Sequence, residues 1–181
     1  MIFGLLRKRA PAELSVTETI YAGIVADARR PAFYRDLGAP DTLPGRFELI
    51  VLHVSLYLRR LSGEGPEAAA RAQGVLDAMF ASLDASLREM GIGDLTVPKK
   101  IKAMASSFYD GLALYDAALS SGDREALASA LRRIVYRDAG AGDGPERLAD
   151  YVALAADALS AQPVDTLVST GPSFPAIEGE A

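Results

Sequence analysis

The sequence predicts an all-α protein: a single globular domain of about six or seven helices, with flexible segments at both ends. Apolar residues recur at helical spacing from Ser15 to Ser160, which is the pattern of amphipathic helices. No segment alternates apolar and polar residues convincingly enough to be a strand. The chain has 181 residues and half of them are hydrophobic, which is typical of one ordinary globular domain.

The first helix is expected to begin at Ser15 and to end before Pro31. Ser15 and Glu18 have the spacing of a capping box, in which the hydroxyl and the carboxylate each accept a hydrogen bond from a free backbone N–H at the helix start. Pro31 cannot continue the helix. A short turn-like helix then runs to Leu37, where Gly38 ends it.

Two longer helices follow. Pro44 suits the first turn of a helix that runs to about Leu61 and is apolar nearly all round, which predicts burial on several sides. After a loop at 63–65, Pro66 begins a long helix with one continuous apolar face. That face comprises Ala68, Ala72, Val75, Leu76, Met79, Phe80, Leu83, Leu87 and Met90.

Three further helices complete the expected domain. A Gly-x-Gly turn at 91–93 ends the long helix, because glycine tolerates the left-handed conformation common at that position. Pro98 suits the start of the next helix, Asp123 caps another, and Pro145 begins the last, which ends at about residue 160.

The chain is therefore expected to have three parts: a flexible segment at 1–14, a helical domain at 15–160 and a disordered tail at 161–181. The tail contains three prolines and lacks helical periodicity, as disordered segments do. The longest strongly apolar stretch inside the chain, 49–58, has ten residues. A membrane-spanning helix needs roughly 20, so none is expected.

Composition excludes several classes of function. The net charge of -5 argues against a general nucleic-acid binder, which needs many cationic contacts with phosphates. The chain contains no cysteine, which excludes disulfides, thiolate metal sites and cysteine nucleophiles. With His53 as its only histidine, a histidine-rich metal site or a Ser-His-Asp triad is untenable without a partner chain.

His53 lies in the middle of the apolar helix. The residues three and four positions away are Leu49, Ile50, Leu56 and Tyr57, and none is a strong metal or haem ligand. The Glu-x-x-His pair of di-iron bundles is also absent. A hydrogen-bonded histidine of the core or of a groove is therefore favoured over a metal ligand.

Paired carboxylates do not predict an enzyme here. Asp77 and Asp84 share a helix face, a placement that acid–base chemistry also uses. Asp84 and Arg88 have the i,i+4 spacing of an ion pair on a solvated helix face, and that interpretation is favoured. We expect no catalytic residue and no cofactor.

The stretch after the Gly-x-Gly turn predicts an interaction surface. Three lysines occupy four positions in the first turn of a helix, where the positive end of the helix dipole makes cations mildly unfavourable. A solvated helix start is one interpretation, and a partner-binding or lipid-facing patch is the other. We expect the partner-binding surface to include Met90, Asp94, Leu95, Lys99, Lys100, Lys102, Met104, Phe108 and Tyr109, together with His53.

The N-terminal segment combines apolar and basic residues. Its charges follow the apolar run, whereas a signal peptide places them before it. A weak anchor at a membrane surface and a disordered N-terminus without such a role are both open. The anchor would comprise Phe3, Leu5, Leu6, Arg7, Lys8 and Arg9.

Two segments resemble a known family. They are RRPAFYRDLGAPDTLPGRFELIVLHVSLYLRRL at 29–61 and AMFASLDASLREMGIGDLTVPKKIKAMASSFYDG at 78–111. The joint occurrence of GRFELIVLH and LREMGIGDL within them is quite specific. In these motifs the chain resembles the ubiquinol–cytochrome c chaperone family, bacterial relatives of a mitochondrial assembly factor for cytochrome b.

The resemblance implies an all-α fold, no enzymatic activity and a role in the assembly of respiratory complex III. The expected partner is newly made cytochrome b, which such proteins hold before it enters the complex. The mitochondrial relatives also work with a small assembly partner and contact the ribosome. The expected location is the bacterial cytoplasm, including peripheral contact with the inner face of the membrane. The alternative is a peripheral membrane protein that handles haem or lipid.

Overall fold

The computed structural model describes residues 15–137 and 142–177, and every regular element in those two ranges is a helix. The all-α prediction is thereby confirmed. The helices are α1 (Val16–Ala28), α2 (Ala32–Arg35), α3 (Leu43–Leu61), α4 (Pro66–Glu89), α5 (Val97–Ser121), α6 (Arg124–Ile134), α7 (Gly144–Ser160) and α8 (Val164–Ser169).

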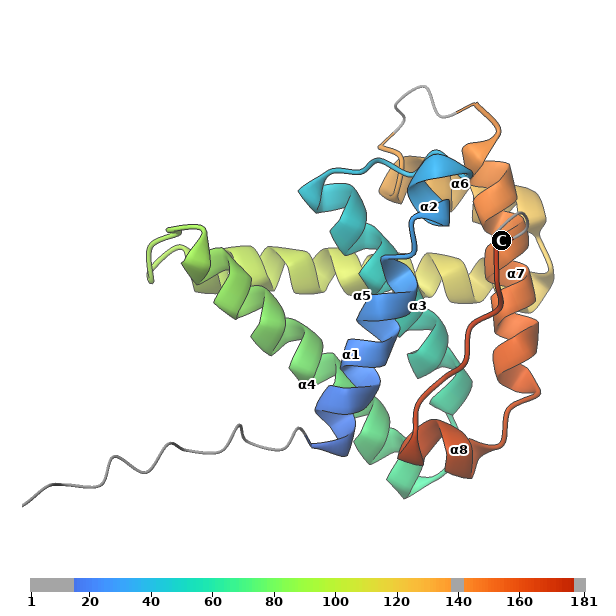
Figure 1. Cartoon of the computed structure of the whole chain (residues 1–181), viewed down its shortest axis with the longest axis horizontal. Helices are drawn as coiled ribbons and strands as arrows, with labels where there is room; N and C mark the ends of the chain where they lie inside the picture. The colour runs from blue at the N-terminus through green and yellow to red at the C-terminus, as the bar shows by residue number, and fades with distance from the viewer. Residues whose placement is uncertain (1–14, 138–141, 178–181) are drawn as a thin grey trace, which may run out of the picture.

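Helix α3 is the centre of the domain. It contacts α1, α4, α5 and α7, and these helices surround it (Figure 1). Every residue from Leu49 to Tyr57 is buried. The helix is apolar nearly all round because it packs against neighbours on several sides.

Helices α4 and α5 form an arm that projects from this core. They are the longest of the described helices, with 24 and 25 residues. They meet at an acute corner, at the left-hand end of the molecule in Figure 1. We call residues 90–102 the α4–α5 corner. At the other end of α5 the chain turns into α6, which packs on α7.

The helix starts follow the local chemistry that the sequence contains. The capping box is present: the Ser15 hydroxyl accepts from the Glu18 backbone N–H at 3.2 Å, and the Glu18 carboxylate accepts from that of Ser15 at 2.8 Å. Thr42 caps α3 through Gly45. Asp123 caps α6, as predicted, by accepting from the backbone N–H of Ala126 at 2.9 Å.

The C-terminal segment corrects the prediction of a disordered tail from residue 161, which is wrong for residues 164–177. Val164–Ser169 forms α8, which packs on α4. The chain then returns along α7 (Figure 1), and Phe174 and Ile177 are buried in the core. The Tyr57 hydroxyl donates to the Leu167 carbonyl at 2.9 Å. This segment is held by a few widely spaced apolar residues that pack on the surface formed by the other helices. Such residues have no helical periodicity, so the sequence pattern does not reveal that the segment is ordered.

None of the helices in the described residues is both long and apolar enough to cross a bilayer.

Candidate functional site

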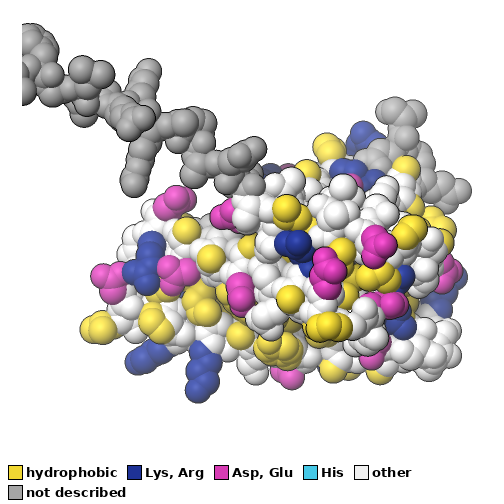
Figure 2. Space-filling model, turned by 90° about the horizontal axis from the view of Figure 1, so that it is seen from below, with side chains coloured by type: hydrophobic (Ala, Val, Ile, Leu, Met, Phe, Trp, Pro, Cys, Tyr) yellow, Lys and Arg dark blue, Asp and Glu magenta, His cyan; other side chains and the backbone are white. Residues whose placement is uncertain are grey.

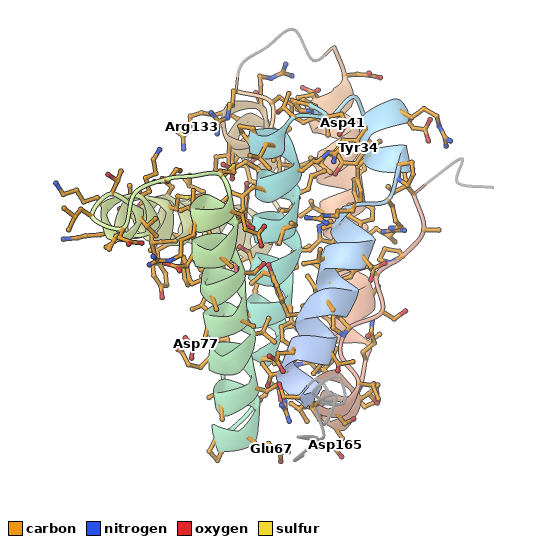
Figure 3. All side chains as sticks on the ribbon, turned by 60° about the vertical axis from the view of Figure 1, so that its left-hand side comes forward. Tyr34, Asp41, Glu67, Asp77, Arg133 and Asp165 are labelled. Carbon is orange, nitrogen blue, oxygen red and sulfur yellow. The ribbon has the colours of Figure 1, made fainter. Side chains whose placement is uncertain are left out.

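An apolar groove of about 740 Å³ lies between α1, α3, α4 and α5. Figure 3 views these helices from the side of the arm, with α3 between α4 and α1. The arm diverges from α1 and from the start of α3, and the groove lies in the resulting angle. Its buried floor consists of Ile50, Val51, Met79, Leu87 and Phe108.

Methionine is concentrated in this groove. The part of the chain that the structure describes contains three methionines, Met79, Met90 and Met104, and all three line the groove. Met79 is buried, whereas Met90 is 52% exposed at the groove edge. Methionine side chains are flexible and polarizable, so they adapt to partners of varied shape. A methionine-lined groove is therefore suited to an apolar partner without one fixed shape.

Charged groups surround the apolar floor. Arg29, Arg46 and Arg137 line the groove, and Glu48 is its one carboxylate. Arg46 is paired with Asp41 at 2.5 Å; Asp41 is labelled beside Tyr34 at the top of Figure 3.

The Glu48–Arg137 pair is looser. Arg137 Nη2 and Glu48 Oε1 are 3.7 Å apart. Burial raises the pKa of the Glu48 carboxyl, and the Arg137 charge opposes that shift. A half-buried carboxylate with one distant cation is a group that a docked partner can satisfy better.

The structure divides the residues predicted to bind a partner. Met90, Met104 and Phe108 line the groove. Five other residues predicted to bind a partner lie outside the groove, at the α4–α5 corner. They are Asp94, Leu95, Lys99, Lys100 and Lys102, all of them exposed. The lysines therefore do not border the groove as a set.

Tyr109 and His53 are also outside the groove. Tyr109 is 53% exposed on α5, with its ring edge-on to Phe108 at 5.3 Å. His53 is fully buried in the core. The histidine therefore lies in the hydrogen-bonded core environment that the sequence favoured, and the structure does not bring it to the groove.

Both ring nitrogens of His53 are engaged. Nδ1 lies 2.7 Å from the Leu49 carbonyl oxygen, which can only accept, so Nδ1 carries the proton. Nε2 then accepts from the Tyr151 hydroxyl at 3.0 Å, and that hydroxyl accepts from Arg30 at 2.9 Å. Burial lowers the pKa of His53 to about 4. To ligate haem or a metal, His53 would have to give up one of these bonds.

The paired carboxylates on α4 have structural partners. Arg88 bonds to Asp84 at 2.6 Å, as predicted, and also to Asp94. Asp77 accepts from the Gln73 side-chain amide at 2.8 Å. Among the described residues, no group of three His, Asp or Glu side chains is placed to hold a metal ion.

One wall of the groove was not predicted from the sequence. It comes from α1 and from the start of α3, and it includes Tyr21, Val25, Leu43 and Phe47. Leu43, the first residue of α3, is 65% exposed. The available signal in the sequence was an apolar residue directly before the predicted helix start at Pro44. The predicted membrane anchor, from Phe3 to Arg9, lies outside the described residues.

Known proteins match this fold and sequence. The family model described as ubiquinol-cytochrome C chaperone matches residues 35–174. The crystal structure of the Cbp3 homologue from Brucella abortus superposes with a TM-score of 0.83 at 38% identity, covering 91% of each chain.

Curated relatives are more distant. Ubiquinol-cytochrome-c reductase complex assembly factor 1 of Xenopus laevis is 26% identical over 139 residues, 77% of this chain and 70% of that protein. The Drosophila melanogaster protein of that name is 27% identical over 163 residues, covering 87% of this chain and 63% of the relative. The human one is 24% identical, and the chain spans about half of it, 51%.

The model match covers most of the chain, and it includes the α3 and α4–α5 segments that form the groove. The chain belongs to the ubiquinol-cytochrome C chaperone family.

Proposed function

We propose that this protein is an assembly chaperone of respiratory complex III, that it holds newly made cytochrome b, and that the methionine-lined groove binds this client. The family is a chaperone family rather than a class of enzymes. The curated relatives are assembly factors of ubiquinol–cytochrome c reductase by name. The single observation that carries the assignment to a site is the apolar groove with its three methionines.

The chemistry of the groove suits a segment of a membrane protein. Before insertion, such a segment exposes an apolar surface of about 20 residues. A groove of about 740 Å³ is within the range of roughly 300–1,000 Å³ found for ligand pockets. A groove of this size accepts the side chains on one face of a helix, as in other helix-in-groove complexes. It does not enclose a whole membrane-spanning helix.

The arginines around the groove complement this assignment. Arg29 is exposed at the C-cap of α1 and lines the groove, as do Arg46 and Arg137. Polar groups around an apolar patch fix the register of a partner more than they add affinity. They are suited to the polar residues that flank an apolar segment.

The haem-handling alternative depended on His53, which is buried with both nitrogens bonded. The structure offers no comparable support for it. Contact with a membrane surface is a separate question, and it depends on different residues.

Crosslinking in membranes of the native organism tests the proposal. A photoreactive amino acid at Leu83, which lines the groove, should capture cytochrome b. The same group at Leu154, which is 54% exposed on α7, should not. Equal capture from both positions would remove the groove as the client site.

Introducing a negative charge into the groove, and at a matched position outside it, provides a functional test. Met90→Glu changes a half-exposed groove residue, and Leu154→Glu changes a similarly exposed residue elsewhere. Both should fold, because surface substitutions usually change stability by less than about 0.5 kcal/mol. Only Met90→Glu should reduce the amount of cytochrome b that accumulates. Normal accumulation in a folded Met90→Glu variant, together with a negative Leu83 crosslink, would refute the assignment.

A further inference from the structure

The α4–α5 corner has exposed apolar side chains at the end of the molecule. Leu95 is 89% exposed, the largest fraction among the large hydrophobic residues that the structure describes, and Met90 is 52% exposed. In Figure 2 hydrophobic and basic side chains lie next to each other at the left-hand end, which is the end where α4 meets α5 in Figure 1. A hydrophobic side chain at a protruding end of the molecule can contact a flat surface without a conformational change.

The exposure of Leu95 follows from an ordered turn. Gly91 has φ 78° and ends α4 in the left-handed conformation. The backbone N–H groups of Thr96 and Val97 both donate to the Gly93 carbonyl, at 2.8 and 3.2 Å. Val97 is fully buried and fixes the far side of the turn, so the backbone holds Leu95 in solvent.

The cations of the corner lack partners. Lys99, Lys100 and Lys102 are exposed, and within residues 15–137 and 142–177 none of them forms an ion pair or a side-chain hydrogen bond. Arg88 binds Asp84 and Asp94, which are two of the three acidic residues between 84 and 102. The lysines also lie at the positive end of the α5 dipole. The charges of all three are therefore available to an external anion.

The exposed side of α5 continues this surface. Tyr109 follows Lys102 by seven residues, so both lie on the same side of the helix. Tyr109 is half exposed. Tyrosine is enriched where proteins meet the headgroup region of membranes, because its ring is apolar and its hydroxyl polar.

We propose that the α4–α5 corner is a docking site for an anionic membrane surface. Leu95 and Met90 enter the headgroup boundary, while Lys99, Lys100 and Lys102 contact lipid phosphates. Charge complementarity supports this partner: the whole chain carries -5, so an anionic bilayer repels it except where a cationic region such as this corner faces the lipid. An apolar protein segment would offer no charge to pair with the three lysines.

This docking gives the groove an orientation. Met90 belongs both to the corner and to the groove lining. If the groove is the client site, as proposed above, then docking places its edge beside the lipid, where an apolar segment leaves or enters the bilayer. The membrane contact itself does not depend on the identity of the client.

Vesicle flotation of the full purified chain tests the proposal without a client. The wild type should float with phosphatidylcholine vesicles containing about one third phosphatidylglycerol, and not with phosphatidylcholine alone. A basic residue near an anionic surface contributes roughly a fivefold factor in binding. The triple variant Lys99→Gln, Lys100→Gln, Lys102→Gln should therefore bind at least about tenfold more weakly. Binding should also weaken with added salt, because screening shortens the range of these charges.

A control variant with the same change in net charge shows whether binding depends on the corner lysines or only on the net charge of the chain. Arg35→Gln, Arg124→Gln and Arg133→Gln together remove three exposed arginines from α2 and α6. This control should bind anionic vesicles within about twofold of the wild type, because its charges do not face the lipid. An equal loss of binding in both triple variants would overturn the proposal.

Site-specific labelling tests the apolar contact. Because the chain contains no cysteine, Leu95→Cys can carry the only environment-sensitive fluorophore, with Ser129→Cys on α6 as the control. Anionic vesicles should shift the emission of the probe at position 95 to the blue, and should leave the probe at 129 unchanged. An unchanged probe at position 95 would contradict insertion of the corner.

Two outcomes would assign the binding to a different surface or to a different partner. If Arg7→Gln, Lys8→Gln and Arg9→Gln abolish flotation while the corner variant retains it, the N-terminal segment is the anchor and the corner is not. If the corner variant floats normally but captures less cytochrome b in crosslinking, the lysines contact protein, and the membrane assignment fails. A Met90→Glu variant that floats normally and fails only in client capture would show that Met90 contacts the client and does not enter the headgroup boundary.

Discussion

The hydroxyl of Tyr151 lies 3.0 Å from Nε2 of His53 and donates to it. The same hydroxyl accepts from Arg30, whose guanidinium also donates to the Pro175 carbonyl at 2.9 Å. One hydrogen-bonded chain, buried at His53 and partly buried at Arg30, therefore joins α3, α7, the segment after α1 and the C-terminal segment. His53 must be neutral to accept the Tyr151 proton, so this arrangement makes stability depend on pH.

Stability should fall as the pH drops from 6.5 towards 4. The pKa of His53 is about 4 in the folded protein, because burial disfavours the charged ring, against an ordinary value of 6.5. Between these values the unfolded chain binds a proton that the folded protein does not, so acid favours unfolding. The loss between pH 7 and pH 5 should be about 2 kcal/mol. Urea unfolding across this range measures it.

His53→Gln is the control for this pH dependence. The glutamine amide can replace part of the hydrogen bonding but does not titrate. The variant should be less stable at pH 7, and its unfolding free energy should change less between pH 7 and pH 5. An identical pH slope in both proteins would show that other groups cause the effect.

The C-terminal segment should contribute measurably to stability. Phe174 is 8% exposed, and its ring lies 4.8 Å from that of His53. Truncating a core phenylalanine costs roughly 3–5 kcal/mol, so Phe174→Ala should lower the melting temperature clearly. Leu154→Ala, at a position 54% exposed, is the matched control and should have little effect. A similar small effect from both would mean that the segment does not pack stably in solution.

Helix starts and stops are local, and for that reason the sequence predicted them well. Ser15, Asp123 and the prolines in the first turns of α3, α4, α5 and α7 act on their own backbone neighbours, and each lies within a residue or two of the observed boundary. Helix α8 was missed because it has six residues and follows a proline. Its stability comes from contacts with α4, which no local pattern contains.

The candidate site was predictable only in part, for the same reason. Met90, Met104 and Phe108 are close in sequence and were identified together. The opposite wall, with Tyr21 and Phe47, comes from helices that approach the arm only in the folded chain. The lysines were expected to share a partner-binding surface with these residues, but they lie at the α4–α5 corner and do not line the groove.

Two glycines should respond to alanine in opposite directions. A Cβ at Gly45 would lie 2.1 Å from the Pro40 carbonyl oxygen, a clash that requires the backbone at the start of α3 to move. Gly45→Ala should therefore cost about 1–3 kcal/mol. Gly23 is within α1, and a Cβ there meets nothing within 4 Å. Gly23→Ala should stabilise the protein by roughly 0.5–1 kcal/mol.

Thermal unfolding of both glycine variants checks this pair. The comparison controls for helix propensity, since both positions are helical and both changes are the same. A Gly45→Ala variant as stable as the wild type would show that the approach of Pro40 to α3 is looser than the structure indicates.

The lysines of the α4–α5 corner should matter for function and not for folding. Replacing all three by glutamine should leave the melting temperature nearly unchanged, since each exposed substitution changes stability by less than about 0.5 kcal/mol, and the change removes cations from the positive end of α5. Phe108→Ala is the contrast within the same helix. Phe108 is 2% exposed and packs edge-on to Phe80 with ring centroids 6.1 Å apart, so its truncation should cost roughly 3–5 kcal/mol.

Differential scanning calorimetry of both variants, followed by measurement of cytochrome b in cells, separates the two roles. The triple lysine variant should fold normally yet accumulate less cytochrome b, because it reaches the membrane poorly. Phe108→Ala should lower both stability and cytochrome b, because it opens the groove floor as well as the core. A triple variant that melts much earlier yet supports normal complex III assembly would show that the lysines are structural, and the functional interpretation of this stretch would then be wrong.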